Sequence, residues 1–175
     1  VSISRVQSSA QFPADFMLVA AMNPHRGGVY MDTPLEDQVS DTYRKKLSGP
    51  ILDRIDLSLD VAHITYDTLT EKRIVRGETE AMRETVSAAR TIQRERLAGR
   101  KARTNAEMSA RDIEEVIVLS PATRSLLTLS AEKLKLSPRS FHRVIKVSRT
   151  IADLESAQEI EERHILEALQ YRVKI

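Results

Sequence analysis

The sequence predicts a mainly helical chain in which a short α/β segment is followed by an all-α bundle. Strand-like patterns occur in about the first third of the 175 residues, and a helical period of apolar residues begins near residue 78. Aromatic residues are few, with four Tyr and three Phe, so we expect a core of aliphatic side chains. We therefore predict an α/β part over residues 1–64, a linker over residues 65–77 and a helical domain over residues 78–175.

The α/β part carries two strand signals with a helix signal between them. A continuous apolar run over residues 16–22 ends at Asn23-Pro24, and such a run suits a strand that is buried on both faces. Apolar and polar residues alternate over residues 57–61, which indicates a second strand. Residues 35–48 are a helix candidate, because the Gly-Pro pair that follows them is a strong helix breaker.

Hydroxyl residues mark several helix starts in the C-terminal part. Ser120 and Ser137 each precede a proline, which suits the first helical position because the missing N–H has no intrahelical partner there. Ser109 is followed three residues later by Asp112, as in a capping box with a shortened acid. These signals predict a bundle of about four or five helices. The first and last of them are expected to begin near Glu78 and Glu161.

Composition excludes several kinds of site. The chain has no cysteine, which rules out disulfides and thiolate metal sites and fits a reducing compartment, so we expect a cytoplasmic protein. No apolar run approaches the roughly 20 residues that span a bilayer, and no membrane contact is expected. His25 and a few scattered acids do not make a tetrahedral zinc site, so we predict no metal. The formal charge of +2 does not by itself imply nucleic acid.

Three cations follow one stripe of the helix predicted after Ser137. Arg139, Arg143 and Lys146 are spaced i, i+4 and i+7 and so share a face. Arg139 also lies in the first turn, where free N–H groups and the helix dipole favour an anion. The stripe is a candidate phosphate site, although the same pattern is typical of an ordinary solvated basic face.

Three segments together resemble a known family. They are residues 16–24 (FMLVAAMNP), residues 46–56 (KLSGPILDRID) and residues 137–154, which end in SRTIADL. In this order and spacing they are similar to the C-terminal half of magnesium-chelatase-related AAA+ ATPases, in particular the ComM/YifB group. The resemblance covers nearly the whole chain. It implies that residues 1–64 are part of an AAA+ α/β core and that residues 78–175 are the helical lid domain.

The resemblance assigns roles to individual residues. Asn23 matches sensor 1, which helps to orient water at the ATP γ-phosphate, although Asn before Pro is also ordinary turn chemistry. Arg54 matches the arginine finger that reaches a neighbouring subunit's nucleotide, the alternative being a local ion pair with the acids beside it. Arg139 matches sensor 2, a nucleotide-binding residue of the lid, with Arg143 as the alternative one turn later. Residues 1–12 resemble the hairpin that precedes sensor 1 and usually lines the pore.

Two parts that ATP hydrolysis requires do not occur in the sequence. It contains no G-x-x-x-x-G-K-[ST] phosphate loop and no apolar strand that ends in two acids to hold Mg²⁺. We therefore expect ATP and Mg²⁺ to be cofactors of a longer parent protein, and this chain alone to be inactive with neither bound. In the family sheet the phosphate-loop strand lies between the two strands predicted here. Residues 1–60 are accordingly expected to be non-native, disordered or paired with another molecule.

The resemblance leaves three functions open. The leading one is a ring-forming, hexameric ATPase that drives DNA branch migration during uptake and recombination, as the ComM-like group implies. A chelatase-type or chaperone-type motor is the second, and a non-catalytic helical assembly module is the third. DNA contact is expected from basic residues that are also compatible with an ordinary charged connector: Arg5, Arg94, Arg96, Arg100, Lys101 and Arg103.

Overall fold

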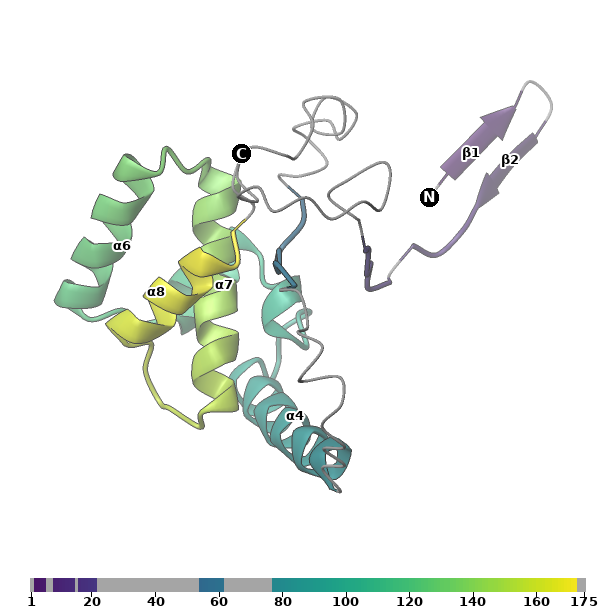
Figure 1. Cartoon of the computed structure of the whole chain (residues 1–175). Coiled ribbons are helices and arrows are strands. Elements are labelled where there is room, and N and C mark those ends of the chain that lie inside the picture. Colours follow the sequence, from purple (N-terminus) through teal and green to yellow (C-terminus); the bar gives the residue numbers. More distant parts are fainter. Residues whose placement is uncertain (1, 6–7, 15, 22–53, 62–76, 173–175) are drawn as a thin grey trace, which may run out of the picture. The chain divides into compact units, whose positions relative to one another are not determined.

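A computed structural model describes residues 2–5, 8–14, 16–21, 54–61 and 77–172 of the chain (Figure 1). Contacts divide the chain into two compact units, Val1–Ser48 and Gly49–Ile175. In the first unit, strands β1 (Ser2–Arg5) and β2 (Ser8–Gln11) form an antiparallel hairpin in which Ile3 lies opposite Ala10. The segment 54–61 belongs to the same unit as the helices.

Helices account for most of residues 77–172, which confirms the mainly helical fold class (Figure 1). Helix α7 is central and contacts α4, η2, α5 and α8, while α6 packs against α8. The bounds in chain order are α4 (Glu78–Arg96), the 3-10 turn η2 (Asn105–Glu107), α5 (Ala110–Val116), α6 (Pro121–Lys133), α7 (Pro138–Leu154) and α8 (Glu162–Gln170).

The predicted helix caps at three serines are confirmed. Ser109 Oγ accepts a hydrogen bond from the Asp112 backbone N–H at 3.2 Å, and the Asp112 carboxylate accepts one from the Ser109 N–H at 2.9 Å. This reciprocal pair is the capping box that begins α5. Ser120 and Ser137 cap α6 and α7 through the hydroxyl alone, which accepts from the N–H three residues later, and each is followed by proline in the first turn.

The core of the bundle is aliphatic, as the composition predicts. Helix α7 buries Val144, Ile145 and Ala152 on the face that it turns toward the other helices. Leu127 of α6 and Ile165 of α8 have no exposed surface and complete this core. Burial of one such side chain stabilises the fold by about 1.5–3 kcal/mol. All residues of this core lie in the helical unit.

The two strands predicted at residues 16–22 and 57–61 are wrong for the parts that the structure describes. Residues 16–21 and 57–61 have no regular secondary structure, and Met17 is 87% exposed. A strand buried on both faces needs strands beside it to satisfy its N–H and C=O groups. None of the described residues pairs with either segment as a strand.

Several predictions fall on other parts of the chain. The helix candidate at residues 35–48 and the sensor 1 candidate Asn23 lie outside the described residues, so both stay predictions. The linker predicted at residues 65–77 lies almost entirely outside them as well. None of the helices in the described ranges is both long and apolar enough to cross a lipid bilayer.

Candidate functional site

Arg139 occupies the first turn of α7 and is exposed. Pro138 opens the helix, and the Ser137 hydroxyl caps it by accepting a hydrogen bond from the Ser140 N–H at 3.2 Å. Among the described residues, the Arg139 guanidinium has no hydrogen-bond or ion-pair partner. A guanidinium at a helix N-terminus can bind an anion through two N–H donors, with additional stabilisation from the helix dipole. Arg139 is therefore available to contact a phosphate.

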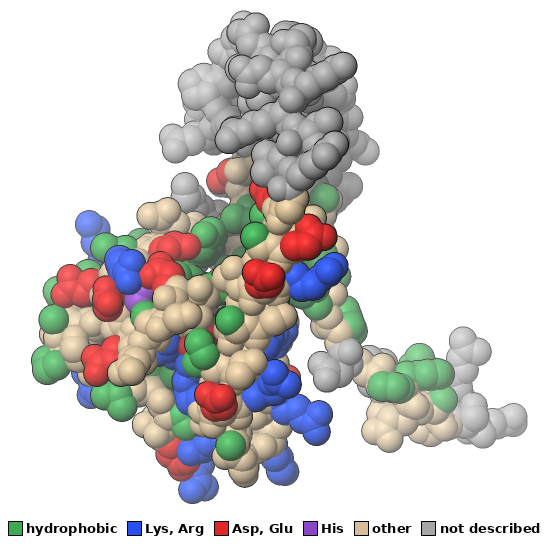
Figure 2. Space-filling model, turned by 90° about the horizontal axis from the view of Figure 1, so that it is seen from below, with side chains coloured by type: hydrophobic (Ala, Val, Ile, Leu, Met, Phe, Trp, Pro, Cys, Tyr) green, Lys and Arg blue, Asp and Glu red, His purple; other side chains and the backbone are tan. Residues whose placement is uncertain are grey.

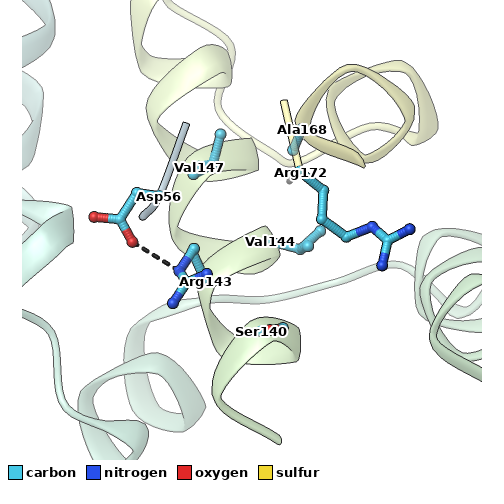
Figure 3. A pocket seen from close by; sticks show the side chains of 7 residues that line it. All are labelled: Asp56, Ser140, Arg143, Val144, Val147, Ala168 and Arg172. Atoms are coloured by element: carbon cyan, nitrogen blue, oxygen red, sulfur yellow. Dashed lines mark ion pairs between the residues drawn. The ribbon is translucent and has the colours of Figure 1, made fainter. Parts of the chain in front are cut away.

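Arg143, one turn further along α7, is bound to residues of the segment 54–61. Its Nε donates to Asp56 Oδ1 at 2.7 Å (Figure 3). Its Nη1 donates to the Ile55 carbonyl oxygen at 3.1 Å. The Arg143 side chain is 15% exposed, whereas that of Asp56 is 66% exposed. A cavity of about 20 Å³, room for one water molecule, lies beside this pair and is lined by Asp56, Ser140, Arg143, Val144, Val147, Ala168 and Arg172.

Lys146, the third cation of the stripe, is directed to the chain between α4 and α5. Its Nζ donates to the Ala106 carbonyl oxygen at 2.9 Å. Burial lowers the pKa of the Lys146 ammonium group, because the charged form loses solvation. The three cations that share one helical stripe thus have different surroundings. Arg139 alone of the three lacks a partner within the described part of the chain.

Arg54, the arginine-finger candidate, lies exposed at the start of the segment 54–61. Asp56, one of the acids beside it in the sequence, pairs with Arg143. The segment is also joined to the end of the bundle, because the Ser58 N–H donates to the Tyr171 carbonyl oxygen at 2.7 Å. The segment that begins with Arg54 is therefore joined to the helices at two points, at Arg143 and at Tyr171.

Some basic residues near the end of α4 form ion pairs with described carboxylates, and others do not. Figure 2 shows Lys and Arg side chains gathered on one side of the helical part, with acidic side chains among them. Arg94, Lys101 and Arg103 are exposed and form no ion pair with described residues. Arg96 and Arg100 each contact carboxylates. Arg5 lies in β1 of the other unit.

The acids that surround Arg100 are ionised at neutral pH. Arg100 Nη1 lies 3.1 Å from Asp112 Oδ1 and 2.7 Å from Glu115 Oε2. Hydrogen bonds from Ser109, together with the one from Arg100, lower the pKa of Asp112 to about 2. Hydrogen bonds from Arg111 and then Arg100 lower the pKa of Glu115. Two carboxylates therefore balance the Arg100 charge, which leaves it little attraction for a phosphate.

Arg96 belongs to a buried polar network centred on Asp153. Its guanidinium forms an ion pair with the Asp153 carboxylate and donates to Asn105 Oδ1 at 3.1 Å. Asn105 Nδ2 in turn donates to Asp153 Oδ2 at 2.8 Å. Arg149, one turn before Asp153, adds a second guanidinium at 3.0 Å. The sequence interpretation missed this network, although the i, i+4 pair Arg149–Asp153 within an apolar segment was a usable signal.

The described residues contain no group of three or more His, Cys, Asp or Glu side chains that could hold a metal ion. His164 is buried, with Nδ1 accepting from the Glu161 N–H at 2.9 Å and Nε2 lying 3.2 Å from Glu155 Oε2. Both ring nitrogens thus have protein partners in the bundle. Arg139 and Arg54 are both exposed.

Comparison with known proteins identifies the family. A family profile described as "Magnesium chelatase, subunit ChlI C-terminal" matches residues 76–172, and one described as "Magnesium chelatase, subunit ChlI" matches residues 1–69. The chain belongs to the magnesium chelatase ChlI family. The first of the two profiles covers the whole helical bundle, including Arg139, and the second covers the segment with Arg54. The resemblance seen in the sequence is thus confirmed, and the magnesium chelatase family is of the AAA+ ATPase type.

Individual relatives of this magnesium chelatase family chain match over almost its full length. It is 43% identical over 178 residues to "Competence protein ComM" of Haemophilus influenzae, which covers 100% of this chain and 34% of that protein. It is 35% identical over 174 residues to "Uncharacterized protein YifB" of Salmonella typhimurium, and equally to that of Escherichia coli, covering 98% of this chain and 34% of each. The chain therefore spans about a third of the length of the curated relatives it matches.

Proposed function

We propose that the chain is the C-terminal part of a ring-forming AAA+ ATPase that acts on DNA as a branch-migration or helicase-type motor. The observation that supports the ATPase role is that Arg139, the residue that resembles sensor 2, is exposed in the first turn of α7. The similarity to a competence protein along the whole chain supports the role in DNA uptake and recombination. We place the motor in the cytoplasm, where ATP and DNA are both available.

In this proposal Arg139 contacts phosphate oxygens of a bound nucleotide. Two parallel N–H donors of a guanidinium fit two oxygens of one phosphate, which fixes orientation as well as charge. The described residues offer no cluster of carboxylates to hold Mg²⁺. The Mg²⁺ ligands, the phosphate loop and most contacts with ATP are therefore assigned to the remaining part of a longer protein. Arg143 already binds Asp56 and Ile55, so we assign the nucleotide contact to Arg139.

Arg54 acts in the proposed mechanism on the nucleotide of the neighbouring subunit. Its guanidinium would neutralise the negative charge that develops on the transferred phosphoryl group. A finger supplied from another subunit contributes roughly 10³–10⁵-fold to the hydrolysis rate. It also requires that subunits assemble side by side, which is the reason to propose a homo-oligomeric ring, with six as the proposed number of subunits.

The proposal is tested by ATP hydrolysis in the longer protein. Arg54→Ala should lower kcat by about 10³-fold or more and leave nucleotide binding nearly unchanged, because the finger contacts the transition state. Arg139→Ala should lower kcat and weaken ATP binding as well. Arg124→Ala is the control, since Arg124 is exposed on α6 and has no side-chain partner among the described residues. Normal turnover by Arg54→Ala would contradict the finger assignment.

A chelatase-type client is the second candidate, because both family descriptions name magnesium chelatase. The motor residues are common to both functions, so the client must be identified directly. Branched DNA should stimulate ATP turnover by the assembled longer protein, and a porphyrin with Mg²⁺ should not. The reverse result would favour the chelatase role. If the longer protein has no ATPase activity, a non-catalytic assembly module becomes the favoured function of the helical bundle.

A further inference from the structure

Arg143 binds the two residues that directly follow Arg54 in the chain. Its Nη1 donates to the carbonyl oxygen of Ile55, and its Nε donates to the carboxylate of Asp56 (Figure 3). One planar guanidinium thus contacts a backbone atom and a side chain of consecutive residues. Arg143 belongs to α7, and its side chain is mostly buried. The position of the backbone beside Arg54 is therefore set from α7.

The segment 54–61 is irregular and is joined to the bundle at a second point, near Tyr171. It forms no helix or strand, and Leu57, Leu59 and Val61 are all exposed. At this second point, the Ser58 N–H donates a hydrogen bond to the Tyr171 carbonyl oxygen. Of these two attachments, the one made by Arg143 lies nearer to Arg54 and involves two hydrogen bonds. Loss of Arg143 would remove both hydrogen bonds that hold Ile55 and Asp56, directly after Arg54, to α7.

We propose that Arg143 is a positioning residue that places Arg54 for its action on the neighbouring subunit. The inference rests on the proposed function, in which Arg54 is the finger and Arg139 contacts nucleotide. Arg139 and Arg143 lie four residues apart on one face of α7, a rise of about 6 Å. The helix therefore connects a residue that contacts nucleotide with a residue that holds the finger segment. A shift of α7 on nucleotide binding moves Arg54 with it.

The contact of Arg143 with Ile55 and Asp56 acts mainly by fixing the position of the backbone and only weakly by electrostatic attraction. Asp56 is largely exposed, and ion pairs of that kind contribute little to stability because water screens them. A lysine would keep the charge but not the planar fork that reaches two acceptors at once. A displacement of about 1 Å in a reacting group can lower the rate by roughly 10²-fold. The expected effect of losing Arg143 is therefore large on turnover and small on folding.

The test measures ATP turnover by the longer protein with Arg143→Met and with Asp56→Asn. Both variants should lower kcat by about 10–100-fold and change the KM for ATP less than about twofold, because the finger acts on the transition state. Arg143→Lys should retain only part of the rate. Arg124→Met on α6 is the matched control and should be without effect. Asp56→Asn changes one exposed side chain, so it keeps the test valid if Arg143→Met unfolds the lid.

A double-mutant cycle separates positioning from a merely structural role. In the Arg54→Ala background, Arg143→Met should cause no further loss of kcat, because the residue that it positions is already absent. Equal losses in both backgrounds, or a raised KM for ATP with kcat retained, would overturn the inference. Normal turnover by Arg143→Met and Asp56→Asn, with Arg54→Ala inactive, would overturn the inference alone. A wild-type protein without ATPase activity, or an active Arg54→Ala, would overturn the proposed function and the inference with it.

Discussion

Arg149 and Asp153 lie one turn apart on α7 and form an ion pair in which both side chains are buried, with Arg149 Nε 3.0 Å from Asp153 Oδ1. The same carboxylate pairs with Arg96 of α4 and accepts a hydrogen bond from Asn105. Arg149 also donates to the carbonyl oxygens of residues 157 and 158, at 2.6 and 2.9 Å. The Asp153 carboxylate thereby contacts two guanidinium groups and joins α4, η2 and α7, and Arg149 extends this network to the chain before α8.

Replacement of Asp153 by asparagine should strongly destabilise the helical unit. Asp153→Asn keeps the volume but leaves Arg96 and Arg149 without their counter-charge inside the bundle. Removal of one partner of a buried pair typically costs about 3–5 kcal/mol. Urea unfolding of the chain, followed by its helical circular dichroism, measures the change. Glu159→Gln is the control on an exposed acid nearby, and a loss below about 1 kcal/mol in Asp153→Asn would contradict the role given to the network.

Two leucines of α6 provide a matched pair for testing the core. Leu127 is fully buried, whereas Leu129 on the same helix is 64% exposed. Leu127→Ala should lower the free energy of unfolding by about 2–5 kcal/mol, because it removes buried methyl groups and leaves a cavity. Leu129→Ala should change it by less than about 0.5 kcal/mol. Similar values for the two variants in the same denaturation experiment would show that α6 is packed differently in solution.

The helical part of the fold follows closely from the sequence. Ser109, Ser120 and Ser137 cap helices because their hydroxyl groups satisfy N–H donors that are local to each helix start. Local hydrogen bonds of this kind can be read from a few residues. The strand predicted at 16–22 depends instead on strands that must lie beside it. Its apolar character identifies a segment that prefers burial, but the sequence cannot provide the neighbours that would bury it.

The stability of the fold at acid pH should depend on the capping box of α5. Ser109 and Arg100 hold the pKa of Asp112 at about 2, well below its ordinary value. A lowered pKa in the folded state stabilises the fold above the ordinary value of 3.8, and this contribution is lost as the pH falls from there towards 2. Ser109→Ala should raise the Asp112 pKa, because it removes the hydroxyl group that contributes most.

A carboxyl-carbon NMR titration of the chain gives the Asp112 midpoint directly. The wild-type chain should titrate near pH 2 and Ser109→Ala at a clearly higher pH. Ser125→Ala on α6 is the control, because the Ser125 hydroxyl donates to the Pro121 carbonyl oxygen and contacts no acid. An unchanged Asp112 midpoint in Ser109→Ala would mean that the Ser109 N–H and Arg100 lower the pKa without help from the hydroxyl group.

DNA binding by the longer protein should depend on the unpaired cations near the end of α4. The triple variant Arg94→Gln, Lys101→Gln, Arg103→Gln should reduce the slope of log K against log salt by about 2–3, since each lost phosphate contact releases one counterion fewer. Arg100→Gln is the control, because Asp112 and Glu115 already balance that charge. A triple variant with the wild-type slope would remove this surface from the DNA interface.

The candidate site could be predicted only in part, because spacing identifies a shared face but not its partners. Arg139, Arg143 and Lys146 share a helical stripe, yet two of them bind segments that are distant in sequence. The pairing of Arg143 with Asp56 spans 87 positions, and nothing local to either residue indicates it. In the same way, Arg96 and Arg94 are neighbours in one basic cluster, but the first faces the bundle and the second faces solvent.

The contacts of Arg149 with the chain before α8 involve carbonyl oxygens of Ala157 and Gln158, which every amino acid possesses. The side chains at these two positions can therefore vary without loss of the hydrogen bonds. An insertion or deletion between Leu154 and Glu161 would instead move both oxygens away from the guanidinium. We therefore expect the length of this turn to be conserved during evolution, while its amino acids at positions 157 and 158 can change.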